Sequence, residues 1–319
     1  MSIEPPRLED DAPSVTYFEQ PVLKQPHWGW NVVTYLFLGG IMGASSMIAA
    51  MVDRTSSTSE NKLARNANLT ALALAVACPL VLISHLGRPE RFLNMLRIIK
   101  FKSPMSVGVW GLVFFSGVAS AAATREFALM GLLPRWLRHI APPGAPLLQA
   151  FLGSFIAGYT GVLLSATAIP IWAKGKRHIP AMSVASGMGS ACALQSLLLL
   201  DGENHQALEK LERFELAAAS AELLIIFDFE KHAGEYGTPM FGGERGAQFR
   251  TLTLTAGLAV PIAINAFRLV FKPRGSIGKL LTVASSTLTL VGGYILRQTL
   301  IESGKDSADD PRAGFAQPE

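Results

Sequence analysis

The strongest constraint on the fold is a series of apolar segments, most of them twenty or more residues long and bounded by charges, glycine or proline. A helix needs about 20 mostly apolar residues to cross the hydrocarbon core of a bilayer. The sequence therefore predicts about eight membrane-spanning helices. Their expected ranges are 30–52, 66–85, 104–124, 146–173, 180–200, 209–229, 251–271 and 277–300.

The composition agrees with a membrane protein. Half of the residues are hydrophobic and only 16% are charged, whereas soluble domains average about 25% charged residues. The net charge is +4, and the basic residues are spread over short connectors. A nucleic-acid-binding protein needs a clustered basic face. We therefore expect an all-α polytopic membrane protein that does not bind nucleic acid.

Stretches of small residues begin the first and fifth expected helices, at 39–46 and 187–190. Small residues allow membrane helices to approach closely, and their recurrence hints at two four-helix halves. Pro170 and Pro261 are expected to kink the fourth and seventh helices. The N-terminal segment is acidic and rich in proline, and it does not resemble a cleaved signal peptide.

The cysteines and histidines do not suggest a bound metal. Cys78 and Cys192 are the only cysteines, and two cysteines in apolar segments cannot supply an iron–sulfur cluster or a zinc site. No expected span has a central histidine, so a haem held by two histidines is not expected. His85 ends the second span and His178 lies at the start of the fifth, which places both at one membrane face.

The connector after the second span is the most informative segment. It follows His85 and carries the basic residues Arg88, Arg91, Arg97, Lys100 and Lys102. A cationic loop beside a histidine at a membrane face could meet an anionic or redox-active group. His85 could donate a hydrogen bond or carry a proton. Arg88 could stabilise the C-terminus of the helix or face an anion.

Two acidic residues lie within the sixth expected span. Glu222 has apolar neighbours, and Glu215 lies two helical turns earlier on the same face. An ionisable group at membrane depth costs a few kcal/mol and usually has a function. The alternative is a structural pair with a basic residue of another helix. Arg297, late in the eighth span, could extend toward the membrane surface.

Aromatic and polar residues of the first and fourth spans suggest a ligand. Tyr159 is expected near mid-depth beside glycines, and its hydroxyl needs a partner. A flat aromatic ligand with a carbonyl group would supply one, and so would an interhelical hydrogen bond. Asn31, Thr34 and Tyr35 form a polar set at the mouth of the first span. They could equally belong to an interfacial aromatic belt.

Together these residues resemble the NrfD family, which includes the membrane subunit of polysulfide reductase. The resemblance extends over residues 28–300, and its most specific part is Leu-Gly-Arg-Pro at 86–89. The other matching segments are 35–40, 91–96, 103–106, 159–161 and 222–224.

The resemblance implies eight helices in two four-helix bundles, 28–173 and 174–300, with polar tails at 1–27 and 301–319. It implies no haem, and a quinone site (menaquinone or ubiquinone) in the first bundle. It also implies docking of a multi-cluster iron–sulfur subunit, often joined to a molybdopterin-type catalytic subunit. The residues that would line the quinone pocket are Asn31, Thr34 or Tyr35, and Tyr159. The residues that match positions tied to activity and proton movement are Glu215, Glu222 and Arg297.

One residue departs from the family pattern. The family commonly has aspartate immediately before Leu-Gly-Arg-Pro, where this chain has His85. The group that would accept a proton from quinol is then an imidazole and not a carboxylate.

These observations lead to the hypothesis of a multi-pass protein of the bacterial cytoplasmic (inner) membrane. It would exchange electrons between the quinone pool and the docked iron–sulfur subunit. Tyr159 and Asn31 would bind the quinone oxygens, His85 would exchange a proton, and Arg88 would favour an anionic form of the ligand. Glu222 would relay protons. A small-solute transporter and a passive membrane anchor are the alternatives, and the sequence leaves the membrane orientation open.

Overall fold

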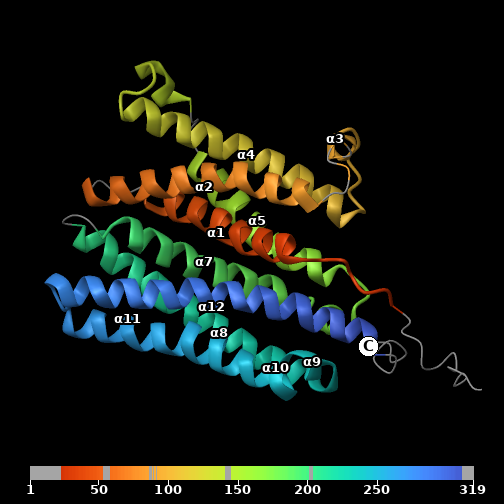
Figure 1. The fold of residues 1–319 in the computed structure, drawn as a ribbon. Helices are drawn as coiled ribbons and strands as arrows, with labels where there is room; N and C mark the ends of the chain where they lie inside the picture. Colours follow the sequence, from red (N-terminus) through yellow and green to blue (C-terminus); the bar gives the residue numbers. More distant parts are fainter. Residues whose placement is uncertain are drawn as a thin grey trace, which may run out of the picture.

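The computed structural model describes residues 23–52, 58–85, 88, 90, 92–140, 145–200 and 204–310, without the side chains of 58, 59 and 85. All regular elements in these ranges are helical (Figure 1). Seven segments are long and apolar enough to cross a membrane. They are Trp30–Val52, Glu60–Ser84, Pro104–Leu129, Ala145–Ser165, His178–Leu198, Gly243–Phe271 and Gly275–Asp309. The prediction of an all-helical membrane protein is confirmed.

Each of the longer helices overlaps an expected span, although α2 begins at Thr58 and not at the expected residue 66. They are α1 (Trp30–Val52), α2 (Thr58–His85), α4 (Pro104–Leu129), α5 (Ala145–Ser165), α7 (His178–Leu198), α8 (His205–Ala233), α11 (Val260–Phe271) and α12 (Gly275–Asp309). The shorter elements are α3 (Phe92–Met95), η3 (Arg135–His139), α6 (Pro170–Lys174), η4 (Gly234–Gly237), α9 (Thr238–Phe241), α10 (Gly243–Gln248) and the π-helix η5 (Phe249–Ala259). The helix α8 has the length of a span but is not apolar enough to be counted among the seven.

The helix contacts form two groups that meet at α1. In the first group α1 and α4 each contact both α2 and α5, and in the second α12 contacts α7, η5 and α11 while α8 contacts α7 and α11 (Figure 1). Helix α1 also contacts α7 and α12 of the second group, and α5 contacts α7. The limits at 173 and 174 and the complete eight-helix, two-bundle arrangement stay predictions.

Small residues let α1 approach both groups. A Cβ added to Gly43 would lie 2.3 Å from the carbonyl oxygen of Gly153 on α5. A Cβ added to Gly187 on α7 would lie 2.9 Å from the carbonyl oxygen of Gly40. Real Cβ atoms do not come so close, so helix packing here depends on glycine.

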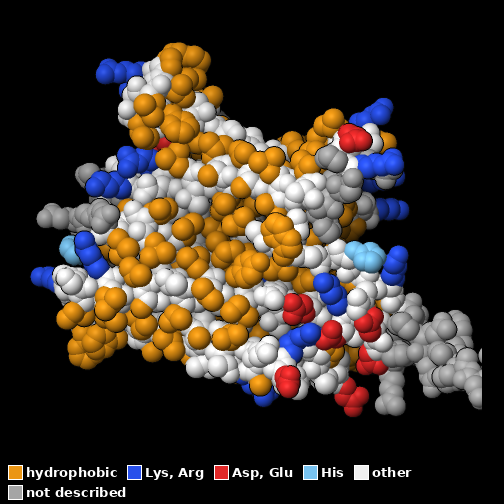
Figure 2. Space-filling view, viewed as in Figure 1, with side chains coloured by type: hydrophobic (Ala, Val, Ile, Leu, Met, Phe, Trp, Pro, Cys, Tyr) orange, Lys and Arg blue, Asp and Glu red, His pale blue; other side chains and the backbone are white. Residues whose placement is uncertain are grey.

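The surface matches a protein that crosses a bilayer. Figure 2 shows hydrophobic side chains over the middle of one face, with most lysine, arginine and acidic side chains toward the two ends of the helices. Large exposed apolar side chains such as Leu80, Phe114 and Val270 lie on long helices. This distribution places hydrocarbon around the middle and water at the ends.

The fourth expected span differs from the prediction. It divides into α5, which ends at Ser165, and α6, which begins at Pro170. The Ser165 hydroxyl donates to the carbonyl of Gly161 at 3.0 Å, and the Thr167 hydroxyl to that of Leu164 at 2.9 Å. Proline has no N–H group to continue the helix. The prediction of one continuous kinked helix through residue 173 is therefore wrong.

Two other differences concern the last helices. The seventh span is π-helical over Phe249–Ala259 and α-helical only from Val260, so the main-chain pattern changes directly before Pro261. Helix α12 continues through residues 301–309, which the sequence analysis assigned to the C-terminal tail. Ser303 and Ser307 in this extension are buried.

Candidate functional site

The start of α1 and the end of α2 meet beside the cationic connector. The Asn31 side-chain nitrogen donates to the Ser84 hydroxyl at 2.9 Å. His85 follows directly, but its side chain lies outside the described residues, as do residues 86, 87, 89 and 91. Arg88 is exposed in a bend. Asn31 is thus placed at the connector, and the roles of His85 and Arg88 stay predictions.

Tyr159 lies near the C-terminal end of α5 and contacts the first turn of α4. Its hydroxyl donates to the main-chain carbonyl of Pro104, the first residue of α4. A Cβ added to Gly108 would lie 2.1 Å from the tyrosine ring, so glycine is required there. Tyr159 was expected at mid-depth, but because α5 ends early the residue is close to the membrane face. Its hydroxyl has an interhelical hydrogen-bond partner, as the alternative interpretation predicted.

The sequence explains why α4 begins at this point. Ser103 is the N-cap residue and accepts a hydrogen bond from the main-chain N–H of Ser106, and Pro104 takes the first helical position. Serine at the N-cap and proline at N1 are the preferred residues for a helix start. The Ser-Pro-Met-Ser segment therefore fixes the carbonyl that Tyr159 contacts.

A cavity of about 380 Å³ opens beside Tyr159, between α5 and the start of α4. The rings of Phe155 and Tyr159 are stacked, with centroids 5.6 Å apart. Apolar and aromatic walls with one nearby ammonium group suit a flat, weakly polar ring. The residues that line the cavity are Phe101, Lys102, Pro104, Val107, Ser154, Phe155, Gly158, Tyr159 and Val162.

The neighbouring residues Thr34 and Tyr35 face different groups of helices. Tyr35 is buried and lies within electrostatic reach of Tyr159 and Cys78. The Thr34 hydroxyl lies 3.5 Å from the hydroxyl of Tyr294 on α12. Neither residue lines the cavity beside Tyr159. Of the two alternatives, Tyr35 is the one near Tyr159.

Arg297 is buried between three helices. Its guanidinium donates to the Ser186 hydroxyl on α7, to the carbonyl of Gly293 at 2.9 Å and to that of Ser183 at 3.4 Å. Its central carbon lies 5.9 Å from the ring centre of Phe37 on α1. Only 3% of the residue is exposed. The expectation that Arg297 could extend to the membrane surface is wrong.

Glu222 lies on the other side of Ser186. It is 3% exposed, interacts with the Ser186 hydroxyl, and lies within electrostatic reach of Arg297. A buried carboxylate with a cationic partner is the arrangement that makes ionisable groups tolerable at membrane depth. Tyr294 lies one turn before Arg297, and its ring packs edge-on against Phe37. We refer to Thr34, Tyr294, Arg297, Ser186 and Glu222 as the polar chain, in which Tyr294 and Arg297 are linked by lying one turn apart on α12 beside Phe37.

A second buried polar cluster surrounds Glu215. Its carboxylate accepts a hydrogen bond from the Thr289 hydroxyl at 2.8 Å, and Asn265 lies beside it. One turn earlier on α8, Glu212 pairs with Arg268 of α11, with 2.6 Å between nitrogen and oxygen. A cavity of about 210 Å³ at this end of α8 has both residues of this ion pair in its lining.

Sequence reasoning identified Glu215, Glu222 and Arg297 but missed the residues that connect them. Glu212 and Arg268 gave a usable signal, because Glu212 precedes Glu215 by one helical turn and Arg268 lies within the seventh apolar segment. Ser186 and Tyr294 gave no signal in the sequence, because serine and tyrosine are common in membrane helices. Only helix packing brings Ser186 near Arg297.

Within the described ranges, no group of three or more His, Cys, Asp or Glu residues could hold a metal ion. Cys78 and Cys192 are buried, unpaired thiols, as expected for small apolar residues in a helix interface.

Comparison with known proteins identifies a family for this chain. The family described as "Polysulphide reductase, NrfD" matches residues 20–306. Protein NrfD of Escherichia coli strain K12 is 25% identical over 224 residues, which cover 63% of this chain and 70% of that protein. The matched region includes seven of the eight longer helices completely and α12 through residue 306. The chain is a membrane protein that belongs to the NrfD family.

Proposed function

We propose that the protein is the quinone-interacting membrane subunit of a respiratory oxidoreductase complex in the bacterial cytoplasmic membrane. Electrons would pass between the quinone pool and a docked iron–sulfur subunit, with coupled proton transfer. The observation that carries the proposal is the aromatic cavity at Tyr159, in a molecule that also holds a buried polar chain leading to Glu222. A passive anchor needs neither the cavity nor buried charges, which are costly in a membrane.

The cavity residues fit a quinone ring. Tyr159 and Phe155 would flank it, and Val107 and Val162 would contact its apolar substituents. Lys102 would lie near an oxygen at the rim. Bound quinone would supply exchange of two electrons and two protons. Asn31 lies at the start of α1, His85 ends α2 and Arg88 follows in the connector, and we propose that they complete the polar side of the site.

The polar chain is the proposed path for protons. Thr34 and Tyr294 would connect the quinone end to Arg297 and Ser186, and Glu222 would take up and release the proton. Glu215 and Glu212 would continue the path to the opposite end of α8. Glu222 and Glu215 are seven residues apart, about 10 Å along the helix, so water would have to join them. We further propose that α8 is the eighth span, which would complete two four-helix bundles at 28–173 and 174–300.

The connector between α2 and α4 is the proposed docking surface for the iron–sulfur subunit. It combines the basic side chains Arg97, Lys100 and Lys102 with exposed apolar ones, and Phe101 is 85% exposed. Exposed aromatic residues with cations at their side are typical of protein interfaces. A molybdopterin-type catalytic subunit would join through that partner.

The test is a titration of the purified protein with a fluorescent quinone analogue. Val162→Phe should fill the cavity without changing a charge, and Tyr159→Phe should remove one hydroxyl. We expect saturable binding to the wild type, loss of binding in Val162→Phe and weaker binding in Tyr159→Phe. Tyr236→Phe, which is remote from the cavity, is the control. If both cavity variants bind as well as the control, the cavity is not the quinone site.

A further inference from the structure

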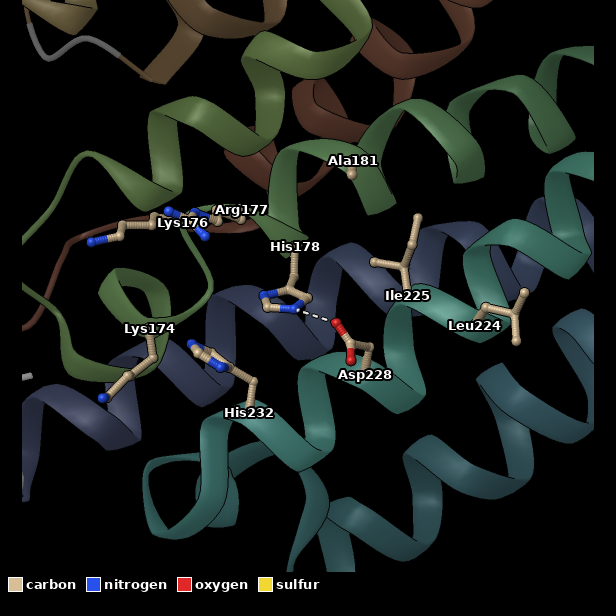
Figure 3. A pocket seen from close by; sticks show the side chains of 9 residues that line it. All are labelled: Lys174, Lys176, Arg177, His178, Ala181, Leu224, Ile225, Asp228 and His232. Carbon is tan, nitrogen blue, oxygen red and sulfur yellow. Dashed lines mark hydrogen bonds and ion pairs between the residues drawn. The ribbon is translucent and has the colours of Figure 1, made fainter. Parts of the chain in front are cut away.

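A further cavity lies in the second group of helices, away from Tyr159. It has about 760 Å³ and opens between the loop after α6, the start of α7 and the end of α8 (Figure 3). In Figure 3 the side chains of Lys174, Lys176 and Arg177 lie on the loop side, while Leu224 and Ile225 come from α8. None of these residues belongs to the proposed quinone site or to the polar chain.

The loop side of the cavity carries excess positive charge. Lys174, Lys176 and Arg177 contribute three fixed cations, and none has an acidic partner among the described residues. The only acidic residue in the lining is Asp228, which His178 contacts through its Nε2 atom at 2.9 Å. The cavity is therefore complementary to an anion.

Two features of His178 also favour an anionic ligand. It is the first residue of α7, whose N-terminus has no side-chain cap and presents a partial positive charge. Its Nδ1 atom is buried and lacks a hydrogen-bond partner among the described residues. Buried polar atoms are normally satisfied, so a ligand that brings a hydrogen-bonding group would complete the site.

The part of the α8 side that Leu224 and Ile225 form is apolar and lies deeper in the membrane than Asp228. Leu224 precedes Asp228 by one turn, about 6 Å along the helix, and is 70% exposed. Ala181 on α7 is also exposed and too small to fill the gap to α8 (Figure 3). A ligand here would have an anionic group at the membrane boundary and a hydrocarbon part beside Leu224.

We propose that this cavity binds an anionic phospholipid. Its phosphate lies among Lys174, Lys176 and Arg177, and an acyl chain runs between Ala181 and Leu224. Basic pockets between membrane helices hold anionic lipid headgroups in this way. Free phosphate would leave the apolar wall uncovered. A soluble protein segment would not reach the wall at membrane depth.

The test measures lipid retained by the full-length chain in nonionic detergent, by native mass spectrometry. The ligands are cardiolipin, phosphatidylglycerol, phosphatidylcholine and inorganic phosphate. One variant removes the three cations (Lys174→Gln, Lys176→Gln and Arg177→Gln). Its control removes three exposed cations outside the cavity (Lys24→Gln, Arg97→Gln and Lys100→Gln). A further variant, Ala181→Phe, fills the apolar gap and keeps every charge.

We expect the wild type and the control to retain cardiolipin and phosphatidylglycerol in preference to phosphatidylcholine. Each basic residue near an anionic headgroup contributes about fivefold in affinity, so removing three should weaken retention about a hundredfold. Ala181→Phe should weaken it as well, although the charge is unchanged. Equal retention of phosphatidylcholine, or of lipid by the triple variant and its control, would overturn the proposal. Inorganic phosphate that prevents retention at millimolar concentration would identify a phosphate site instead.

Discussion

The buried group formed by Arg297, Ser186 and Glu222 predicts a strong energetic coupling between two helices. Arg297 comes from α12, Glu222 from α8, and both are 3% exposed. The guanidinium also donates to the carbonyls of Ser183 and Gly293. Its charge is therefore compensated by one carboxylate and several dipoles, all inside the protein.

The magnitude follows from what each substitution leaves behind. Removing one partner of a buried ion pair costs about 3–5 kcal/mol, because the other charge stays buried and unpaired. We expect this loss in the free energy of unfolding for Glu222→Leu, which leaves the guanidinium with dipoles only. Arg297→Met should cost a similar amount. The double variant removes both charges together, and it should be more stable than the sum of the two losses by about 2 kcal/mol.

The assay is reversible unfolding in mixed micelles, followed by circular dichroism, for the wild type, both single variants and the double variant. Gln298→Met, next to Arg297 but with an exposed side chain, is the matched control and should change stability by less than about 0.5 kcal/mol. Losses that add up in the double variant would refute the coupling. Arg297 would then be held by the main-chain carbonyls and Ser186 alone.

Three further predictions concern individual positions. Gly43→Leu should destabilise the protein by about 2 kcal/mol because its Cβ would meet the Gly153 carbonyl, whereas Gly117→Leu, with open space around it, should have no effect in the same unfolding assay. Gly108→Ala should displace the Tyr159 ring and weaken binding of the fluorescent quinone analogue by roughly tenfold, about the contribution of one hydrogen bond; unchanged affinity would separate Tyr159 from the ligand. Thr34→Val should leave that affinity unchanged but slow quinol-dependent reduction of an electron acceptor, because Thr34 faces Tyr294 and not the cavity; an equal loss of affinity would place Thr34 in the site itself.

The length and apolar character of the spans were predictable because each depends only on local sequence. The expected range 30–52 coincides with α1, and Pro104 begins α4 as expected. The break between α5 and α6 was harder to predict from the sequence. It depends on the Ser165 and Thr167 hydroxyls folding back on the main chain, a choice that apolar length does not reveal. The π-helical stretch before Val260 likewise has no simple sequence pattern.

In the candidate site, too, some residues could be predicted from the sequence and others could not. Glu222 and Tyr159 could be selected because a carboxylate or a phenol is unusual within an apolar span. Their partners could not, because Ser186 and Arg297 are 111 residues apart in the chain and only helix packing brings them together. Thr34 and Tyr35 were placed in one polar set because they are adjacent, although adjacent helical residues point about 100° apart.

That divergence has a mechanical consequence. Helix α1 is in backbone contact with α5 through Gly43 and with α7 through Gly40, so it has little room to bend between them. A displacement of α1 at Tyr35, which lies near Tyr159, would therefore displace Thr34 as well and alter its contact with Tyr294 on α12. A single helix would thus couple the surroundings of Tyr159 to the second group of helices.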